Sequence, residues 1–165
     1  MGRPVIFRVN PEFEDEWAGS SALATEVVLN TIRVGDALTR RVDAMVRSYG
    51  LPSSTALIVL EVLRGAGQPL QPSVIAERSF LSRPALSSVL DTLERRDLLR
   101  RAFHPEDRRR VLVEITDAGI DVMERVLPEL HRAEAEWIGG LSVRAKTDLL
   151  RQRGHLQRDL IDGSG

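Results

Sequence analysis

The sequence predicts a mostly helical protein whose series of helices is interrupted once by a β-hairpin. Apolar residues recur every three to four positions towards both ends of the chain, as they do along helices that bury one face. The hydrophobic residues, 42% of the total, are mainly Leu, Val, Ala and Ile, with only 4% aromatic residues. This composition suits packed helices better than a β-sandwich. Residues 98–103 and 110–115, by contrast, are interpreted as two short strands, the second with alternating apolar residues.

The N-terminal third predicts a tail followed by one long helix. Residues 1–20 are interpreted as a tail or a short extra helix. From Ser21 to Gly50 the apolar residues follow helical spacing, and Gly50 ends the helix. Its apolar face consists of Leu23, Val27, Val34, Leu38, Val42, Met45 and Tyr49.

Three shorter helices are expected next. One begins at Pro52-Ser53-Ser54 and ends near Gly65, and a second follows Pro72. Ser82 caps a third helix that runs to about Arg96, with Pro84 tolerated in its first turn. Two short helices joined by a tight turn form the outline of a helix-turn-helix.

A β-hairpin, or wing, follows these helices. Its strands are expected from Leu98 to Phe103 and from Arg110 to Ile115, joined by the polar turn at residues 104–107. After it, Thr116-Asp117 caps a helix in which Pro128 should introduce a kink, and Gly139-Gly140 ends that helix.

The last helix follows Ser142 and has an apolar stripe of Leu149, Leu150, Leu156 and Leu160. The stripes near both ends exceed what one small core needs, so a second copy of the chain is expected to bury part of them. We therefore interpret residues 21–50 and 117–162 as flanking dimerisation helices. Residues 51–116 form the central winged helix-turn-helix unit.

Length and composition exclude several classes of protein. A chain of 165 residues suits one ordinary domain with its own core. It has no cysteine, which excludes disulfides and thiolate metal sites. Because no apolar run has the length of a membrane span or a signal peptide, we expect a cytoplasmic protein without membrane contact.

The charge distribution is informative although the formal net charge is only −1. Residues 95–110 contain seven arginines against three acidic residues, an excess of four positive charges. Guanidinium groups suit the recognition of phosphates and DNA grooves. A GC-rich genome produces the same preference for arginine over lysine.

Five short motifs follow one another in the central part of the chain. They are Leu81-Ser82-Arg83-Pro84, Leu93-Glu94, Leu98-Leu99-Arg100-Arg101, Pro105-Glu106-Asp107-Arg108-Arg109 and Ile115-Thr116-Asp117-Ala118-Gly119. Together they resemble the winged helix-turn-helix of MarR-type transcriptional regulators, and a weaker similarity covers the span from Leu23 to Leu160. Asp97 and Ile115 depart from the family pattern, which usually has glycine and leucine there. Asp tolerates the left-handed conformation that glycine adopts after a helix.

The resemblance implies a ligand-responsive repressor that binds double-stranded DNA as a homodimer on a pseudo-palindromic operator. Residues 51–116 are then the DNA-binding domain, and the helix after Ser82 enters the major groove. Its first turns present groups that reach bases and phosphates, namely Ser82, Arg83, Pro84, Ser87 and Ser88. Ser87 and Ser88 are the expected base readers. From spacing alone, both serines fit a solvated helix surface equally well.

The wing carries a run of three arginines, Arg108, Arg109 and Arg110. Asp107 lies two residues before Arg109, and we expect its carboxylate to accept from that guanidinium and hold it extended. Arg109 then reaches the minor groove, where negative potential is focused, while Arg108 and Arg110 reach phosphates or one of them shares the groove. Charge runs are more often solvated surface, but the turn at Pro105 favours a functional wing.

Two other classes of function compete with a DNA-binding regulator. The first is a winged-helix module that binds protein without specific DNA binding, which the basic segment disfavours. The second is a small cytosolic enzyme, although no nucleophile, base and orienting acid lie at local spacing. No cofactor is expected. His104, His131 and His155 are too far apart for a local metal site, and only His131 with Glu134 places two metal-binding side chains on one helix.

The resemblance also implies a small-molecule pocket between the first two helices and the fifth. Family members with an N-terminal extension include urate responders in which a tryptophan of the extra helix takes part, and Trp17 is similar in position. The acidic partner expected in the second helix is replaced by Ser54-Thr55-Ala56, so the effector stays unassigned. Candidates by position only are Trp17, Arg33, Arg40, Tyr49 and Met123.

Overall fold

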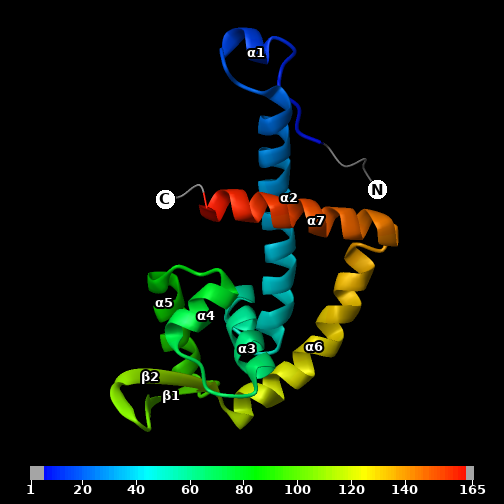
Figure 1. Ribbon diagram of the computed structural model, residues 1–165. Helices are drawn as coiled ribbons and strands as arrows, with labels where there is room; N and C mark the ends of the chain where they lie inside the picture. Colours follow the sequence, from blue (N-terminus) through cyan, green and yellow to red (C-terminus); the bar gives the residue numbers. More distant parts are fainter. Residues whose placement is uncertain (1–5, 163–165) are drawn as a thin grey trace. The chain divides into compact units, whose positions relative to one another are not determined.

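The computed structural model describes residues 6–162, except for the side chains at positions 108, 161 and 162. Seven helices and one antiparallel hairpin follow one another along this part of the chain (Figure 1). The chain divides into two compact units, one ending at Val126 and the other beginning at Leu127, so helix α6 contributes to both. Among the described residues, no helix is both long enough and apolar enough to span a membrane.

The long helix α2, Ala22–Ser48, begins where the sequence predicts it. The Ser21 hydroxyl accepts the Ala24 N–H at 3.3 Å, and Gly50 adopts a left-handed conformation (φ +88°) just after the helix. Near its C-terminal end the helix contributes Val46 to the core. Its N-terminal half leaves its apolar side chains, including Leu23 and Val34, exposed in the single chain.

Residues 6–20 form a tail that folds back on α2 and contains the one-turn helix α1, Phe13–Glu16. The Asn30 amide pairs with the backbone of Phe7: it accepts the Phe7 N–H at 2.9 Å and donates to the Phe7 carbonyl at 3.0 Å. Glu26 forms an ion pair with Arg8 and accepts the Val9 N–H at 3.2 Å. The predicted tail is therefore tethered to α2 by side chains of that helix.

Helix α3, Ser54–Ala66, is the centre of the first unit and contacts α2, α4, α5 and the second strand. Two side chains hold its first turn. Ser53 accepts the Ala56 N–H at 3.2 Å, and the Asp43 carboxylate of α2 accepts the Ser54 N–H at 2.6 Å. This hydrogen bond lowers the pKa of Asp43 below its usual value, with a smaller contribution from the charge of Arg47.

Two short helices, α4 (Pro72–Ser79) and α5 (Arg83–Glu94), form the helix-turn-helix. Between them Phe80 has a positive φ of 55°, and the Leu81 N–H donates to the Ala76 carbonyl at 3.1 Å. Helix α5 ends two residues before the predicted Arg96. It stops there because Asp97 is left-handed (φ 57°) and the Leu98 N–H returns to the Leu93 carbonyl at 3.0 Å.

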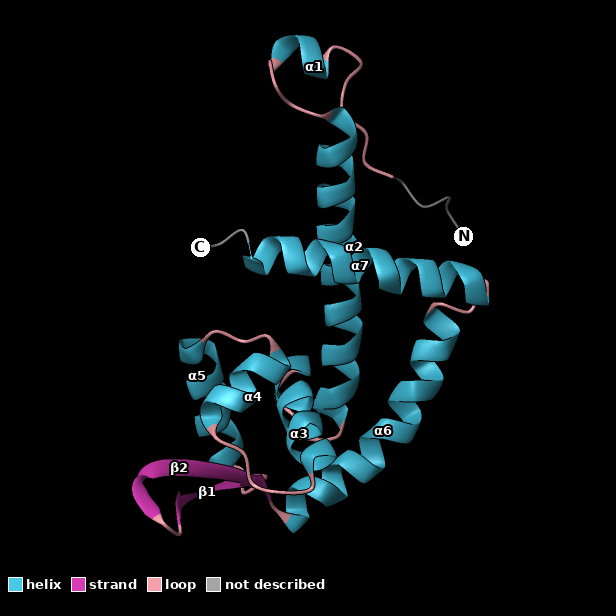
Figure 2. Ribbon diagram, in the orientation of Figure 1, coloured by secondary structure: helices cyan, strands magenta, loops and turns pink. Residues whose placement is uncertain are grey.

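Strands β1, Leu99–His104, and β2, Asp107–Ile115, form the wing, which projects beyond the helices of the first unit (Figure 2). The predicted boundaries were wrong at the turn: only two residues connect the strands, and β2 begins at Asp107 instead of Arg110. The pairing shifts register between Phe103 and His104, which brings His104 opposite Asp107.

Leu70 joins the hairpin to the chain before α4. Its N–H donates to the Val113 carbonyl at 2.9 Å and its carbonyl accepts from the Val113 N–H at 2.8 Å. This isolated antiparallel bridge adds one residue pair beside β2 of the two-stranded sheet. Val113 itself is fully buried, so the base of the wing is fixed to the core of the first unit.

The C-terminal part of the chain consists of α6, Asp117–Trp137, and α7, Val143–Asp162. Thr116 caps α6 by accepting the Gly119 N–H at 3.1 Å, and Ser142 caps α7 by accepting the Ala145 N–H at 3.2 Å. Both caps are at the predicted positions. Helix α6 continues through Pro128, and the kink expected there stays a prediction.

Candidate nucleic-acid interface

Helix α5 has one buried and one exposed face. Leu86, Leu90 and Leu93 are at most 2% exposed and pack into the core. The opposite face contains the residues predicted to reach DNA, which are all exposed: Ser82, Arg83, Pro84, Ser87 and Ser88. The Ser82 hydroxyl accepts the Ala85 N–H at 3.4 Å, so this side chain fixes the start of the helix.

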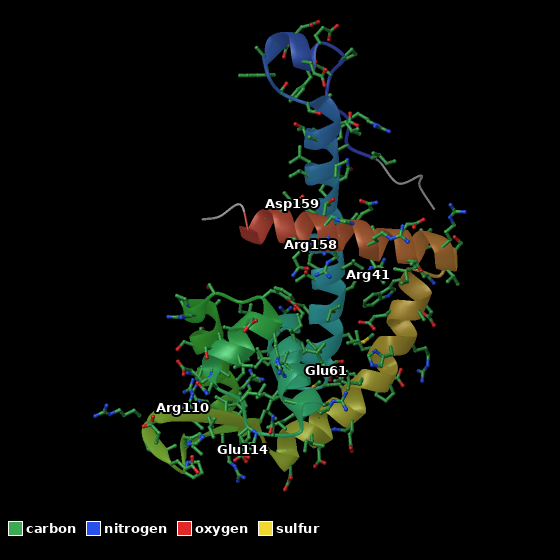
Figure 3. The ribbon with its side chains drawn as sticks, viewed as in Figure 1. Arg41, Glu61, Arg110, Glu114, Arg158 and Asp159 are labelled. Atoms are coloured by element: carbon green, nitrogen blue, oxygen red, sulfur yellow. The ribbon has the colours of Figure 1, made fainter. Side chains whose placement is uncertain are left out.

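The wing presents Arg109 and Arg110 to solvent, while the side chain of Arg108 lies outside the described set. Arg110 is on β2, on the projecting part of the hairpin (Figure 3). The Asp107 carboxylate accepts the backbone N–H of Arg109 at 3.0 Å. This differs from the expected bond to the guanidinium. Asp107 therefore orders the main chain of the wing and leaves the Arg109 side chain exposed.

The basic segment divides into arginines with and without intramolecular partners. Arg95 donates to the Thr92 hydroxyl at 3.1 Å, and Arg96 donates to the Gly50 carbonyl at 2.7 Å. Arg100 pairs at 2.5 Å across the hairpin with Glu114, which is labelled in Figure 3. Arg101 pairs with both Asp91 and Glu94 at 2.7 Å. The guanidinium groups of these four arginines are therefore engaged by partners within the protein.

The remaining arginines of the exposed face are different. Within the described part of the chain, no carboxylate lies within ion-pair distance of the guanidinium groups of Arg83, Arg109 and Arg110. Positive charge without a neutralising partner is therefore concentrated at the start of α5 and on β2 of the wing. Such a surface attracts a polyanion, because each unpaired guanidinium can replace a condensed counterion on a phosphate.

Sequence reasoning missed the double ion pair of Arg101. The signal that indicates it is the spacing of Asp91 and Glu94, which lie three residues apart on one helix face before a basic strand.

Among the described residues, the other candidates form no cluster that could hold a metal ion. His131 pairs with Glu134 through Nδ1 at 3.1 Å, and no third ligand joins them among the described residues. Trp17 is exposed, Tyr49 is half-buried, Met123 is fully buried in the core, and Arg40 pairs with Asp36. The fold and its exposed cationic face define a winged helix-turn-helix protein of the DNA-binding class.

Comparison with known proteins agrees with this class. A model of the MarR family matches residues 49–110. The uncharacterized HTH-type transcriptional regulator YwaE of Bacillus subtilis (strain 168) is 34% identical over 119 residues, which are 72% of this chain and 69% of YwaE. The HTH-type transcriptional regulator PecS of Dickeya dadantii (strain 3937) is 31% identical over 139 residues, which are 82% of this chain and 83% of PecS.

A solved structure is similar as well. The crystal structure of the PcaV transcriptional regulator from Streptomyces coelicolor, in complex with its natural ligand, has a TM-score of 0.68 and 25% identity, and the match covers 89% of this chain and 99% of PcaV.

The chain belongs to the MarR family and is a helix-turn-helix transcriptional regulator.

Proposed function

We propose that this regulator is a homodimeric repressor that binds a pseudo-palindromic operator and leaves it when a small molecule binds. The observation that carries the proposal is the selective exposure of hydroxyl groups and unpaired guanidinium groups on α5 and the wing. The neighbouring arginines, in contrast, are held by intramolecular partners. Since its target is chromosomal DNA, we expect the protein to act in the cytoplasm.

In this proposal α5 is the recognition helix and lies in the major groove. Ser87 and Ser88 are exposed, short and close to the helix start, so they can approach base edges and donate or accept hydrogen bonds. Arg83 and the hydroxyl of Ser82 lie nearer the start, where they contact the phosphates that flank the read bases. Pro84 fills the first turn without an N–H that needs a partner.

The wing lies beside the groove that α5 occupies. Arg109 enters the neighbouring minor groove, and Arg108 and Arg110 contact phosphates on either side. The hydrogen bond that the Arg109 backbone N–H donates to the Asp107 carboxylate supports this arrangement, because it fixes the start of β2 and so the direction in which the strand leaves the turn. Minor-groove contacts add affinity with little sequence information.

Exposed apolar side chains support the dimer. Leu149, Leu150 and Leu160 of α7 are each more than 60% exposed in the single chain, as is Leu23 of α2. Such surface is costly to leave in water, and burial against a second copy stabilises both chains. PcaV is a related regulator with a natural ligand, and this supports a ligand-responsive mechanism here.

Selection of genomic DNA fragments on the purified full-length protein, followed by sequencing, tests the proposal. We expect one enriched motif with two inverted half-sites whose centres lie about 10 base pairs apart. An enriched motif without two-fold symmetry would contradict the dimeric binding mode. Recovery of no motif from a correctly folded dimer would favour the protein-binding module instead.

A further inference from the structure

Arg101 joins the wing to the recognition helix. From strand β1, its Nη1 donates to Oε2 of Glu94 and its Nη2 donates to Oδ1 of Asp91, both at 2.7 Å. The two carboxylates lie one turn apart on α5. Because one planar guanidinium is held by two successive turns of the helix, the attachment fixes direction as well as distance.

The alternation of the strand explains why Arg101 makes this link and Arg100 does not. Successive side chains of a strand point to opposite faces. Arg101 shares its face with Leu99, which is 1% exposed, and lies opposite the buried Val113. Arg100 belongs to the other face, where it pairs with Glu114 of the opposite strand. Its ion pair thus stays within the hairpin.

The surface between α5 and the wing is hollowed beside Arg101. A hollow of about 560 Å³ is lined by residues of α4, α5 and the hairpin, among them Leu90, Val111, Asp91 and Arg101. At a hollow, fewer side chains of the two elements pack against each other, so polar contacts across it contribute more to holding them together. The ion pairs of Arg101 bridge the elements at this hollow.

We propose that Arg101 is a positioning residue that holds α5 and the wing at a fixed angle, so that one subunit makes its major-groove and minor-groove contacts in register. This inference rests on the proposed function, which places α5 in the major groove and the wing in the minor groove. The Arg101 side chain is only 29% exposed and both its outer nitrogens are occupied, so its effect is exerted without contact with DNA. An ordered wing loses less conformational freedom on binding.

A purely electrostatic role of this ion-pair cluster can be distinguished from positioning, because the two predict opposite changes in DNA affinity. The cluster of Asp91, Glu94 and Arg101 has a formal charge of −1. Replacing all three by neutral residues (Asp91→Asn, Glu94→Gln and Arg101→Gln) raises the local charge to zero. If the cluster acted by charge alone, this variant would bind every DNA more tightly. If Arg101 positions the wing, the variant binds its operator more weakly.

The matched control removes an ion pair from the same strand without loosening the wing from α5. It combines Arg100→Gln with Glu114→Gln, which leaves the net charge unchanged. Thermal unfolding measures the stability of both variants relative to the wild type. A loss of folded protein can then be distinguished from a loss of DNA binding.

The test uses full-length protein, a duplex with the motif recovered by genomic selection and a scrambled duplex of the same length. We expect the triple variant to bind the motif duplex about tenfold more weakly than the wild type. It should lose hydroxyl-radical protection of the minor groove and keep methylation protection of guanine N7 in the major groove, while the control keeps both. Unchanged affinity and protection in the triple variant would overturn this inference alone. A wild type that leaves the minor groove unprotected would overturn the proposed wing contact and this inference together.

Discussion

The carboxylate of Asp107 accepts the backbone N–H of Arg109 at 3.0 Å, while the Arg109 side chain stays exposed. Asp107 therefore orders the backbone at the start of β2, and the Arg109 guanidinium remains available to DNA. We expect Asp107→Ala to weaken binding of the motif duplex less than Arg109→Ala does, because the charge remains and only its placement is lost. Asp107→Asn keeps an oxygen acceptor and should bind more tightly than Asp107→Ala. Equal affinities of the Asn and Ala variants for the motif duplex, measured by titration, would show that the hydrogen bond has no role in the wing.

Arg109→Ala should weaken binding to motif and scrambled duplexes alike, since the minor groove carries little sequence code. Loss of one groove or phosphate contact lowers the slope of log affinity against log salt by about one unit. Fluorescence anisotropy over a range of salt concentrations measures both effects. Arg100→Ala is the control, because its guanidinium is already paired with Glu114. A folded Arg109→Ala dimer with unchanged affinity for both duplexes would show that the wing does not reach the DNA.

Ser87→Ala and Ser88→Ala should reduce specificity and leave the salt dependence intact. Each removes one short hydrogen-bonding group at a base edge, which costs on the order of 1 kcal/mol on the motif duplex. The cost on the scrambled duplex should be much smaller. Competition between the two duplexes measures the ratio. If both affinities fall equally, these serines contact the backbone and do not read bases.

Asp97→Gly should stabilise the protein. Asp97 has a φ of 57°, a conformation that is strained for a residue with a Cβ and free of strain for glycine. The gain should be about 0.5–1 kcal/mol, less what glycine adds to the freedom of the unfolded chain. Asp121→Gly, at an exposed position of α6, is the matched control and should lower stability, because glycine is a poor helix former. Thermal unfolding of both variants should therefore show shifts of opposite sign.

Leu149→Glu and Leu150→Glu should shift the protein from dimer to monomer. Both side chains are more than 60% exposed in the single chain, so a charge there costs little in the monomer and much in a buried interface. Gln152→Glu adds the same charge at an exposed polar position of α7 and serves as control. Analytical ultracentrifugation gives the assembly state. Leucine variants that sediment as wild-type dimers would exclude this stripe from the interface.

The helices could be predicted because their boundaries depend on local signals. Ser82, Thr116 and Ser142 cap helices at the predicted positions, and the left-handed Asp97 agrees with the family resemblance, which usually has glycine there. The start of β2 was missed because three consecutive arginines hide the alternation of a strand. The shortened turn depends on a register shift at Phe103, which only the pairing of the two strands determines.

The exposed residues of α5 could be predicted, but which arginines have intramolecular partners could not. A charge count treats every arginine of residues 95–110 alike. Several partners lie far along the chain or on another element: Gly50 lies 46 residues before Arg96, and Glu114 lies across the hairpin from Arg100. Only the tertiary fold decides which guanidinium groups are already engaged and which remain available to a polyanion.

The hydrogen bond from Arg96 to the Gly50 carbonyl has a mechanical consequence. It anchors the chain just beyond the C-terminal end of α5 to the joint between α2 and α3. From Glu94 to Arg83 the helix spans roughly 17 Å at 1.5 Å per residue. A rotation of α5 about this anchored end would therefore displace the start of the helix, near Ser87, more than its C-terminal end. A rotation of about 10° over that length would move the first residues by about 3 Å, close to the rise of one base pair along the duplex.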